Sequence, residues 1–261
     1  MPALYDLIGS TYAKTRLADP GITQNLAREI RLTSSGTYLD LACGTGNYTV
    51  ALSSLGGTWT ATDVSDVMLT QARKKSNTIS WVQSSADALP FSNAAFDGAI
   101  CTLAIHHFPD LESSFTEIRR TLRSGSFVIF TGLEEQMRHY WLCHYFPVMM
   151  ARAIDKMPSE SQIRAALLNS GFKSISVNPF FVTDQLQDLF LFSGKRRPNL
   201  YLNPGVRANI SSFASLAPTV EVQHGLARLA ADIRSGAVDK IIAQYGNEIG
   251  DYAYITARAD T

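Results

Sequence analysis

The chain of 261 residues is 46% hydrophobic, which is enough to bury one complete α/β core with additional segments. Lysine and arginine together number 23, as do aspartate and glutamate, so no net charge attracts the protein to nucleic acid or to an anionic membrane. The three cysteines are odd in number and unevenly spaced, which favours free thiols and a cytoplasmic location.

Residues 1–36 are expected to form an N-terminal arm followed by a helix. The sequence Asp-Pro-Gly at residues 19–21 is a helix start signal and predicts a helix over residues 22–32. The first residues lack the basic start and apolar core of a secretory signal. Within the arm, Tyr12 and Arg16 either contact a ligand or simply pack and face solvent.

Residues 38–47 are predicted to form a buried strand followed by a tight glycine loop, which leads into a helix over residues 48–55. Gly44 and Gly46 would let a ligand approach the backbone, while the opening N–H groups of the helix favour a negatively charged group. In the dinucleotide-binding fingerprint a third small residue follows three positions later, but Thr49 stands there in this chain.

Two aspartates near this loop indicate which ligand it binds. Asp40 lies at the end of the first strand, where it would repel a pyrophosphate but could pair with the ammonium group of a bound amino acid. Asp63 ends a second predicted strand, over residues 59–63. One ionised carboxylate at that point can accept hydrogen bonds from both hydroxyls of a ribose.

Two further residues follow in the same half of the chain. Met68 belongs to a helix capped by Ser65, and it either lies against a ligand ring or packs in the core. A third strand is predicted over residues 79–83, and Asp87 follows it in the sequence Ala-Asp-Ala-Leu-Pro-Phe. An isolated aspartate in a turn is usually a turn former, but its position after a strand favours a role in binding.

A fourth strand is predicted over residues 96–102, and the loop that leaves its carboxyl end contains His106 and His107. One interpretation is that a histidine positions a substrate or takes its proton, and the other is that the pair only stabilises the loop. A structural or positioning role is favoured. Because adjacent residues rarely converge on one ion and no further ligand follows at a suitable spacing, no metal site is predicted.

The second half of the chain completes the α/β pattern and adds a helical segment. In order, we expect a helix over residues 113–123, a strand over 127–130, a helix over 160–169, and strands over 172–181 and 252–257. Residues 132–157 are rich in aromatic residues and methionine, which suits a core or an apolar pocket. Their most hydrophobic part, residues 140–153, is too short to span a membrane.

Residues 184–250 are expected to form a mostly helical cap, with helices around residues 185–191, 204–215 and 226–245. The predicted division of the chain is an arm and helix (1–36), a core (37–183 and 251–261, with 132–157 lining a pocket) and a cap insertion (184–250). The basic run at residues 194–198 is too short to predict nucleic-acid binding.

Four features follow one another in a set order over residues 38–131. They are Asp40 with the two glycines, Asp63 with Met68, Asp87, and the loop after the fourth strand. This pattern resembles class I S-adenosylmethionine-dependent methyltransferases of the type 11 (ubiquinone/menaquinone-biosynthesis-like) group. The resemblance implies a Rossmann-like α/β fold, with a seven-stranded mixed sheet covered by helices on both faces, and S-adenosylmethionine as cofactor. The helical cap is added to that fold.

The resemblance also assigns residues. It implies that Asp63 binds the ribose, that Asp87 accepts from the adenine amino group, and that Tyr12 and Arg16 belong to an arm over the cofactor. The complete set expected to bind the cofactor is Tyr12, Arg16, Asp40, Ala42, Gly44, Gly46, Asp63, Val64, Met68, Asp87, Ala88 and Leu103. The candidates for catalytic roles are His107, His106 and Tyr12, the last through a cation–π contact with the sulfonium.

The expected function is in-line transfer of a methyl group to a small, partly apolar acceptor of biosynthetic or secondary metabolism. One alternative is an NAD(P)-dependent Rossmann oxidoreductase, against which Thr49, Asp40 and Asp87 argue. Another is a protein that binds S-adenosylmethionine as a partner without catalysis. The expected partner is a small-molecule acceptor, with neither nucleic acid nor a membrane span.

Overall fold

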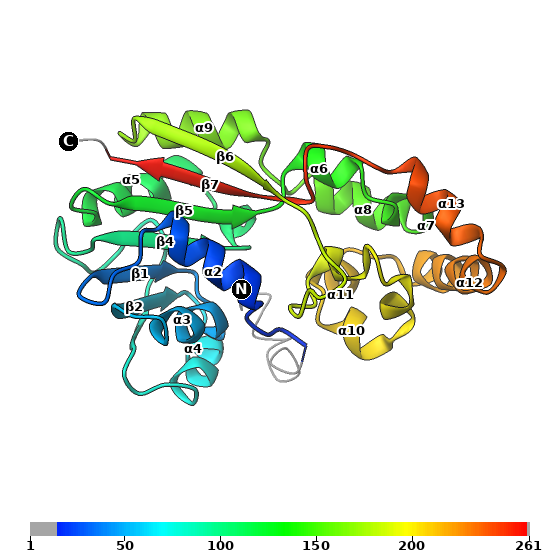
Figure 1. The fold of residues 1–261 in the computed structure, drawn as a ribbon, viewed down its shortest axis with the longest axis horizontal. Coiled ribbons are helices and arrows are strands. Elements are labelled where there is room, and N and C mark those ends of the chain that lie inside the picture. The colour runs from blue at the N-terminus through cyan, green and yellow to red at the C-terminus, as the bar shows by residue number, and fades with distance from the viewer. Residues whose placement is uncertain (1–14, 260–261) are drawn as a thin grey trace.

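A computed structural model describes residues 15–259, and a seven-stranded sheet lies at its centre (Figure 1). The strands are β1 Thr37–Leu41, β2 Thr58–Asp63, β3 Ser80–Gln83, β4 Gly98–Thr102, β5 Ser126–Thr131, β6 Ser174–Phe180 and β7 Tyr252–Arg258. Their spatial order is β3-β2-β1-β4-β5-β7-β6. The first five strands are parallel, whereas β7 is antiparallel to both of its neighbours. The predicted mixed sheet is therefore confirmed.

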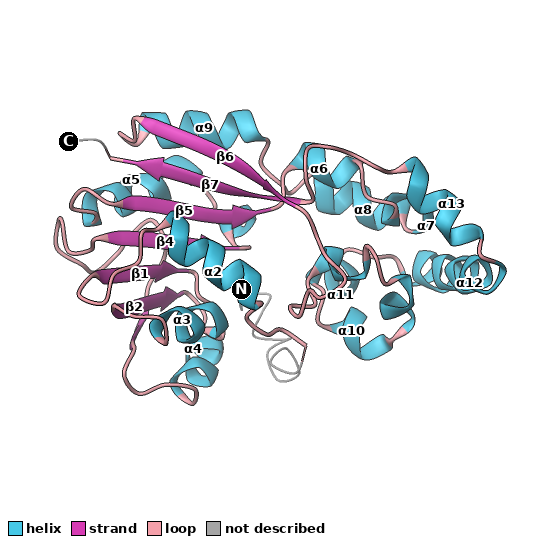
Figure 2. Cartoon of the chain, viewed as in Figure 1, coloured by secondary structure: helices cyan, strands magenta, loops and turns pink. Residues whose placement is uncertain are grey.

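Helices cover both faces of this sheet, as predicted (Figure 2). The helices of this part are α2 Pro20–Glu29, α3 Asn47–Ser53, α4 Asp66–Arg73, α5 Leu111–Thr121 and α9 Glu160–Asn169. Alternate residues of β1 enter separate apolar layers, because successive side chains of a strand point to opposite faces. Tyr38 packs in the layer formed with α2 and α3, while Leu39 packs in the layer formed with α5 and α9.

A second group of helices lies beyond the carboxyl ends of the parallel strands (Figure 1). It consists of α6 Glu134–Arg138, α7 Leu142–Tyr145, α8 Pro147–Ile154, α10 Pro204–Ala208, α11 Ser211–Ser215, α12 Thr219–Ser235 and α13 Ala237–Gln244. The Tyr145 hydroxyl donates to Asp232 at 2.9 Å, and Glu221 accepts from the backbone N–H of Val148 at 2.6 Å. Residues 132–157 and the later helices therefore pack together as one helical cap.

The predicted cap helices differ in detail from the observed ones. The segment 204–215 forms two short helices, and the segment 226–245 is divided by Gly236, whose φ of 75° ends α12 in a left-handed turn. No α-helix forms over residues 185–191, which are followed by a 3₁₀ turn at Leu191–Gly194. Apolar periodicity marks buried positions, but capping and tertiary packing decide where a short helix stops.

The hydrophobic stretch 140–153 folds as parts of the short, buried helices α7 and α8. Tyr140 and Trp141 lie inside the cap, where the Tyr140 hydroxyl bonds to that of Tyr201 and the Trp141 indole N–H donates to the Lys195 carbonyl at 3.0 Å. Within residues 15–259 we find no helix with both the length and the apolar character needed to cross a bilayer.

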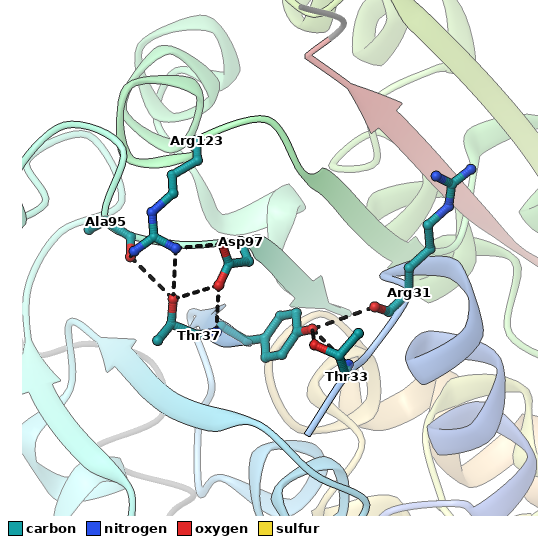
Figure 3. A network of polar contacts seen from close by, with 7 residues as sticks. Arg31, Thr33, Thr37, Ala95, Asp97 and Arg123 are labelled. Atoms are coloured by element: carbon teal, nitrogen blue, oxygen red, sulfur yellow. Dashed lines mark hydrogen bonds and ion pairs between the residues drawn. The ribbon is translucent and has the colours of Figure 1, made fainter. Parts of the chain in front are cut away.

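The turn before β5 lies at the opposite end of the sheet from the cap and carries a polar network (Figure 3). Thr37 donates through its backbone N–H to Asp97 at 2.8 Å, and Arg123 bonds to the carboxylate of Asp97. A β-carbon on Gly125 would overlap the carbonyl oxygen of Asp97, so this short turn needs glycine there. The network stabilises a connection that is remote from the cavities described next.

Candidate active site

The loop after β1 bends through backbone conformations that side chains disfavour. Ala42, Gly44 and Gly46 have φ values of 56°, 56° and 71°. A β-carbon on Gly44 would meet no protein atom within 4 Å, whereas one on Gly46 would overlap the ring of Trp81. The two predicted glycines thus have different functions, since Gly44 keeps a cavity open and Gly46 permits packing against β3.

A cavity of about 400 Å³, the glycine-loop cavity, lies at the carboxyl ends of β1, β2 and β4. Of the residues predicted to bind a ligand, eight line it: Arg16, Asp40, Ala42, Gly44, Asp63, Val64, Met68 and Leu103. Ligands of open α/β sheets bind at such strand ends. The structure therefore brings these eight residues together around one cavity.

Three predicted residues do not line the glycine-loop cavity. Gly46 supports the loop from behind, as described above. Asp87 and Ala88 are exposed, and Asp87 accepts a hydrogen bond from the Ser85 hydroxyl; Ser84, Ser85 and Ala86 line the cavity instead. Tyr12 lies outside the described residues. Met68 is 2% exposed and also lines the cavity, so its side chain both packs in the core and borders the ligand space.

Asp40 is buried at the base of the cavity, and its partner is Thr49 of α3. The Thr49 hydroxyl donates to one carboxylate oxygen at 2.5 Å, while the other oxygen, Oδ1, is buried with no hydrogen-bond partner among the described residues. Burial raises the pKa of Asp40 to about 7; the Thr49 hydrogen bond opposes the rise and the charge of Asp63 adds to it. In the sequence, Thr49 is notable only because it replaces the third small residue of the dinucleotide-binding fingerprint. In the structure it is part of the site.

Asp63 is held by the backbone on both of its carboxylate oxygens. The N–H of Gly44 donates to Oδ2 at 2.8 Å, and the N–H of Ser65 donates to Oδ1 at 2.9 Å. A carboxylate oxygen accepts more than one hydrogen bond, so both oxygens keep capacity for a ligand. Asp63 therefore fixes the glycine loop and also presents acceptors to the cavity.

Arg16 reaches the cavity from the segment before α2, and Asp188 holds it there. Arg16 donates to the Asp188 carboxylate from Nε at 2.5 Å and from Nη2 at 3.1 Å, and the Tyr48 hydroxyl donates to the same carboxylate at 3.1 Å. The Asn47 side chain also donates to the Arg16 carbonyl, at 2.6 Å. Asp188 is 1% exposed and was not predicted, because no local motif surrounds it.

A second cavity of about 100 Å³, the cap cavity, lies between the glycine-loop cavity and the cap helices. Arg16, Leu103 and His107 line both cavities and form their shared wall. The remaining wall combines apolar side chains with hydroxyl groups, and includes Met137, Met157, Phe190, Leu191, Ile210, Leu216, Ser211 and Ser212. Two adjoining cavities can hold two molecules in contact.

The histidine pair lies in a 3₁₀ turn, Ile105–His107, directly after β4. Burial lowers the pKa of His106 to about 3, assisted by the nearby charges of His107 and Lys156, and its Nδ1 has no partner among the described residues. His107 is exposed at the cavity surface. Its pKa is lowered, first by desolvation and then by Lys156. Both imidazoles are neutral at pH 7.

No cluster of three or more histidine, cysteine or carboxylate side chains suited to a metal ion occurs in the part of the chain that the structure describes. The three cysteines are unpaired, and burial raises the pKa of each thiol. Thiols with a raised pKa stay protonated at pH 7, which disfavours thiolate chemistry.

Comparisons with known proteins agree with this geometry. Residues 39–130 match the family model described as a methyltransferase domain. The chain is 32% identical over 169 residues to the O-methyltransferase rstn1 of Aspergillus nomiae, covering 59% of this chain and 73% of that protein. It is 36% identical over 98 residues to a malonyl-[acyl-carrier protein] O-methyltransferase of Erwinia pyrifoliae, covering 37% of each protein.

A solved structure is similar over nearly the whole chain. It is the crystal structure of a protein of Anabaena variabilis described as a methyltransferase from an antibiotic biosynthesis pathway. The two chains are 34% identical, with a TM-score of 0.83, and the alignment covers 93% of this chain and 98% of the other. The similarity includes the cap as well as the sheet.

Proposed function

The chain belongs to the class I S-adenosylmethionine-dependent methyltransferases, and from that premise we propose that it methylates a small, partly apolar acceptor held in the cap cavity. The observation that carries this proposal is the shared wall of the two cavities. Arg16, Leu103 and His107 line both, so a ligand in the glycine-loop cavity adjoins a ligand in the cap cavity.

The glycine-loop cavity fits S-adenosylmethionine by its unsatisfied polar groups. Buried oxygens without a hydrogen-bond partner among the described residues occur on Asp40, Thr62, Ser84 and Thr102, and all four residues line this cavity. Buried polar groups are normally satisfied, so such a set indicates a polar ligand or ordered water. An amino-acid and nucleoside ligand supplies donors of the required kind.

Individual residues would divide the binding between them. Asp40 would pair with the ammonium group of the cofactor, Asp63 would accept from its ribose hydroxyls, and Met68 would contact its adenine. When bound, S-adenosylmethionine supplies an activated methyl group on a sulfonium. The protein therefore needs chiefly to align the two ligands and exclude water. Holding reactants in a productive orientation can lower the reaction barrier by about 7–11 kcal/mol.

The histidines are suited to positioning the acceptor. A neutral imidazole both donates and accepts one hydrogen bond, and His107 is placed at the shared wall. A lowered pKa makes it a weak base, which suffices for an acceptor that is already ionised or readily ionised. His106 would hold the turn and contact the acceptor from the cap cavity, while any role of Tyr12 lies outside the described residues.

The named relatives favour an oxygen acceptor in a biosynthetic pathway. Two of them are O-methyltransferases, and the similar structure is described as part of an antibiotic biosynthesis pathway. The relatives therefore support the class of reaction, and the cap cavity supports a compact, partly apolar molecule.

The test is methyl transfer from methyl-labelled S-adenosylmethionine to a panel of small phenols, hydroxy acids, amines and thiols, with mass detection of the product. We expect label in at least one oxygen acceptor. Saturating S-adenosylmethionine should also stabilise the fold, by about 2.7 kcal/mol at 100 times its dissociation constant. Stabilisation by NAD instead would contradict the proposal, and stabilisation by S-adenosylmethionine without transfer to any acceptor would favour a non-catalytic binding protein.

A further inference from the structure

The cap cavity has an unbalanced positive charge. Among residues 15–259, two cations, Arg16 and Lys156, line it, and no carboxylate does. Arg16 is neutralised by the buried carboxylate of Asp188. Lys156 forms no ion pair with any residue between 15 and 259, and its exposed neighbour Asp155 does not line the cavity.

Lys156 follows the end of α8 and stands where the cavity meets solvent. Its side chain lines the cap cavity although the residue as a whole is exposed. It is close enough to both histidines for its charge to lower the pKa of each, after the larger effect of desolvation. The ammonium group therefore faces two neutral imidazoles, which cannot compensate its charge.

The rest of the wall decides what kind of molecule this charge would bind. Met137, Met157, Phe190 and Leu216 provide an apolar surface for a short hydrocarbon body. One ammonium matches one negative charge. A phosphate monoester carries about 1.5 to 2 negative charges at pH 7 and would leave part of its charge unpaired, so a carboxylate is the better match.

We propose that the methyl acceptor is a phenol- or enol-carboxylic acid whose carboxylate pairs with Lys156. The readily ionised phenol or enol loses its proton to solvent, and its oxygen forms the new O–CH₃ bond as the S–CH₃ bond of the donor breaks. Lys156 lines the cap cavity but not the glycine-loop cavity. The wall that the two cavities share is formed by Arg16, Leu103 and His107. The carboxylate is therefore the anchor, and the oxygen that is methylated lies at the other end of the molecule. This inference rests on the proposed function and makes Lys156 the residue that selects negatively charged acceptors.

The experiment compares acids with their amides. The protein is saturated with S-adenosylhomocysteine, and binding of 3-hydroxybenzoate, 4-hydroxybenzoate and the corresponding amides is measured by calorimetry at millimolar concentrations. We expect at least one acid to bind about fivefold more tightly than its amide. Lys156→Met should remove that preference and Lys156→Arg should keep most of it, because only the charge is required.

Lys240→Met is the matched control, since Lys240 is an exposed lysine of α13 that lines neither cavity. It should behave as the wild type does. Equal binding of acid and amide, no detectable binding of either acid, or an acid preference that survives in Lys156→Met would each overturn the inference. If S-adenosylhomocysteine itself does not bind, the proposed function fails with it, whereas cofactor binding without an acid preference overturns the acceptor assignment alone.

Discussion

Asp40 and Thr49 show how one residue pair can prepare a site for a cation. The buried Asp40 carboxyl has a pKa of about 7, far above its ordinary value of 3.8, because burial disfavours its charge. The Thr49 hydroxyl satisfies one oxygen and leaves the other without a protein partner. An ammonium group placed beside that oxygen would favour the ionised form and draw the pKa down.

This arrangement predicts that cofactor affinity depends on pH. A protonated Asp40 cannot pair with an ammonium group, so the cofactor must bind the ionised form, and affinity should fall as pH drops below about 7. The limiting slope is about tenfold per pH unit. Calorimetric titration with S-adenosylhomocysteine between about pH 6 and pH 8, about one unit on either side of that pKa, measures it.

Asp40→Asn is the control for that prediction, because the amide keeps the shape of the side chain and does not titrate. It should bind the cofactor more weakly at pH 8 and show a flat profile below pH 7. A wild-type profile that is flat, or a slope that persists in the asparagine variant, would assign the pH dependence to another group.

Two segments far apart in the chain are joined at the site. Arg16 precedes α2, and Asp188 follows β6, 172 residues later. Their ion pair is accompanied by a hydrogen bond from the Leu189 N–H to the Thr15 carbonyl at 3.2 Å. Because Arg16 lines both cavities, this clasp of residues 15–19 and 186–190 also sets the shape of their shared wall.

Asp188→Asn is expected to destabilise the protein by about 3 kcal/mol, because it removes the buried carboxylate that pairs with the mostly buried Arg16 guanidinium. Urea unfolding measures this loss, and cofactor affinity should fall as well. Asp184→Asn removes an exposed carboxylate from the same segment and should change neither quantity. Equal effects of the two variants would show that the clasp contributes little.

At the scale of the whole molecule, the sheet and the cap share one apolar layer. A single cluster of buried residues extends from Ile22 of α2 and Val128 of β5 through Tyr140 to Leu229 of α12 and Val238 of α13. A core that is continuous across two structural layers is expected to melt in one cooperative transition. The cap should therefore not unfold independently of the sheet.

Gly225→Ala tests that expectation. A β-carbon at residue 225 would lie 2.5 Å from both Phe146 Cε1 and the Tyr145 carbonyl oxygen, so α12 must move away from α7 and α8 at a cost of about 1–3 kcal/mol. Calorimetry should show one transition at a lower temperature. Gly246→Ala, whose β-carbon would meet nothing closer than 3.8 Å, should melt like the wild type. A separate early transition in Gly225→Ala would show that the cap is an independent unit.

Local sequence patterns were sufficient to predict the strands and most helices beside them, and the family resemblance implied their assembly into a mixed sheet. Strand ends, glycines and the carboxylates that follow them are set by neighbours a few residues away, so Asp40, Gly44 and Asp63 could be placed before the structure was known. The same local pattern carried the family resemblance, which similarity to known methyltransferases confirms.

Tertiary structure alone decided the rest. Asp188 belongs to no local motif, and its role depends on the ion pair with Arg16. Thr49 becomes a hydrogen-bond donor to Asp40, and Lys156 adds its charge to the cap cavity, only when separate segments pack together. The cap helices of four to eight residues are too short to be stable alone, so packing fixes their ends. The local glycine loop shapes the glycine-loop cavity, whereas long-range packing shapes the cap cavity.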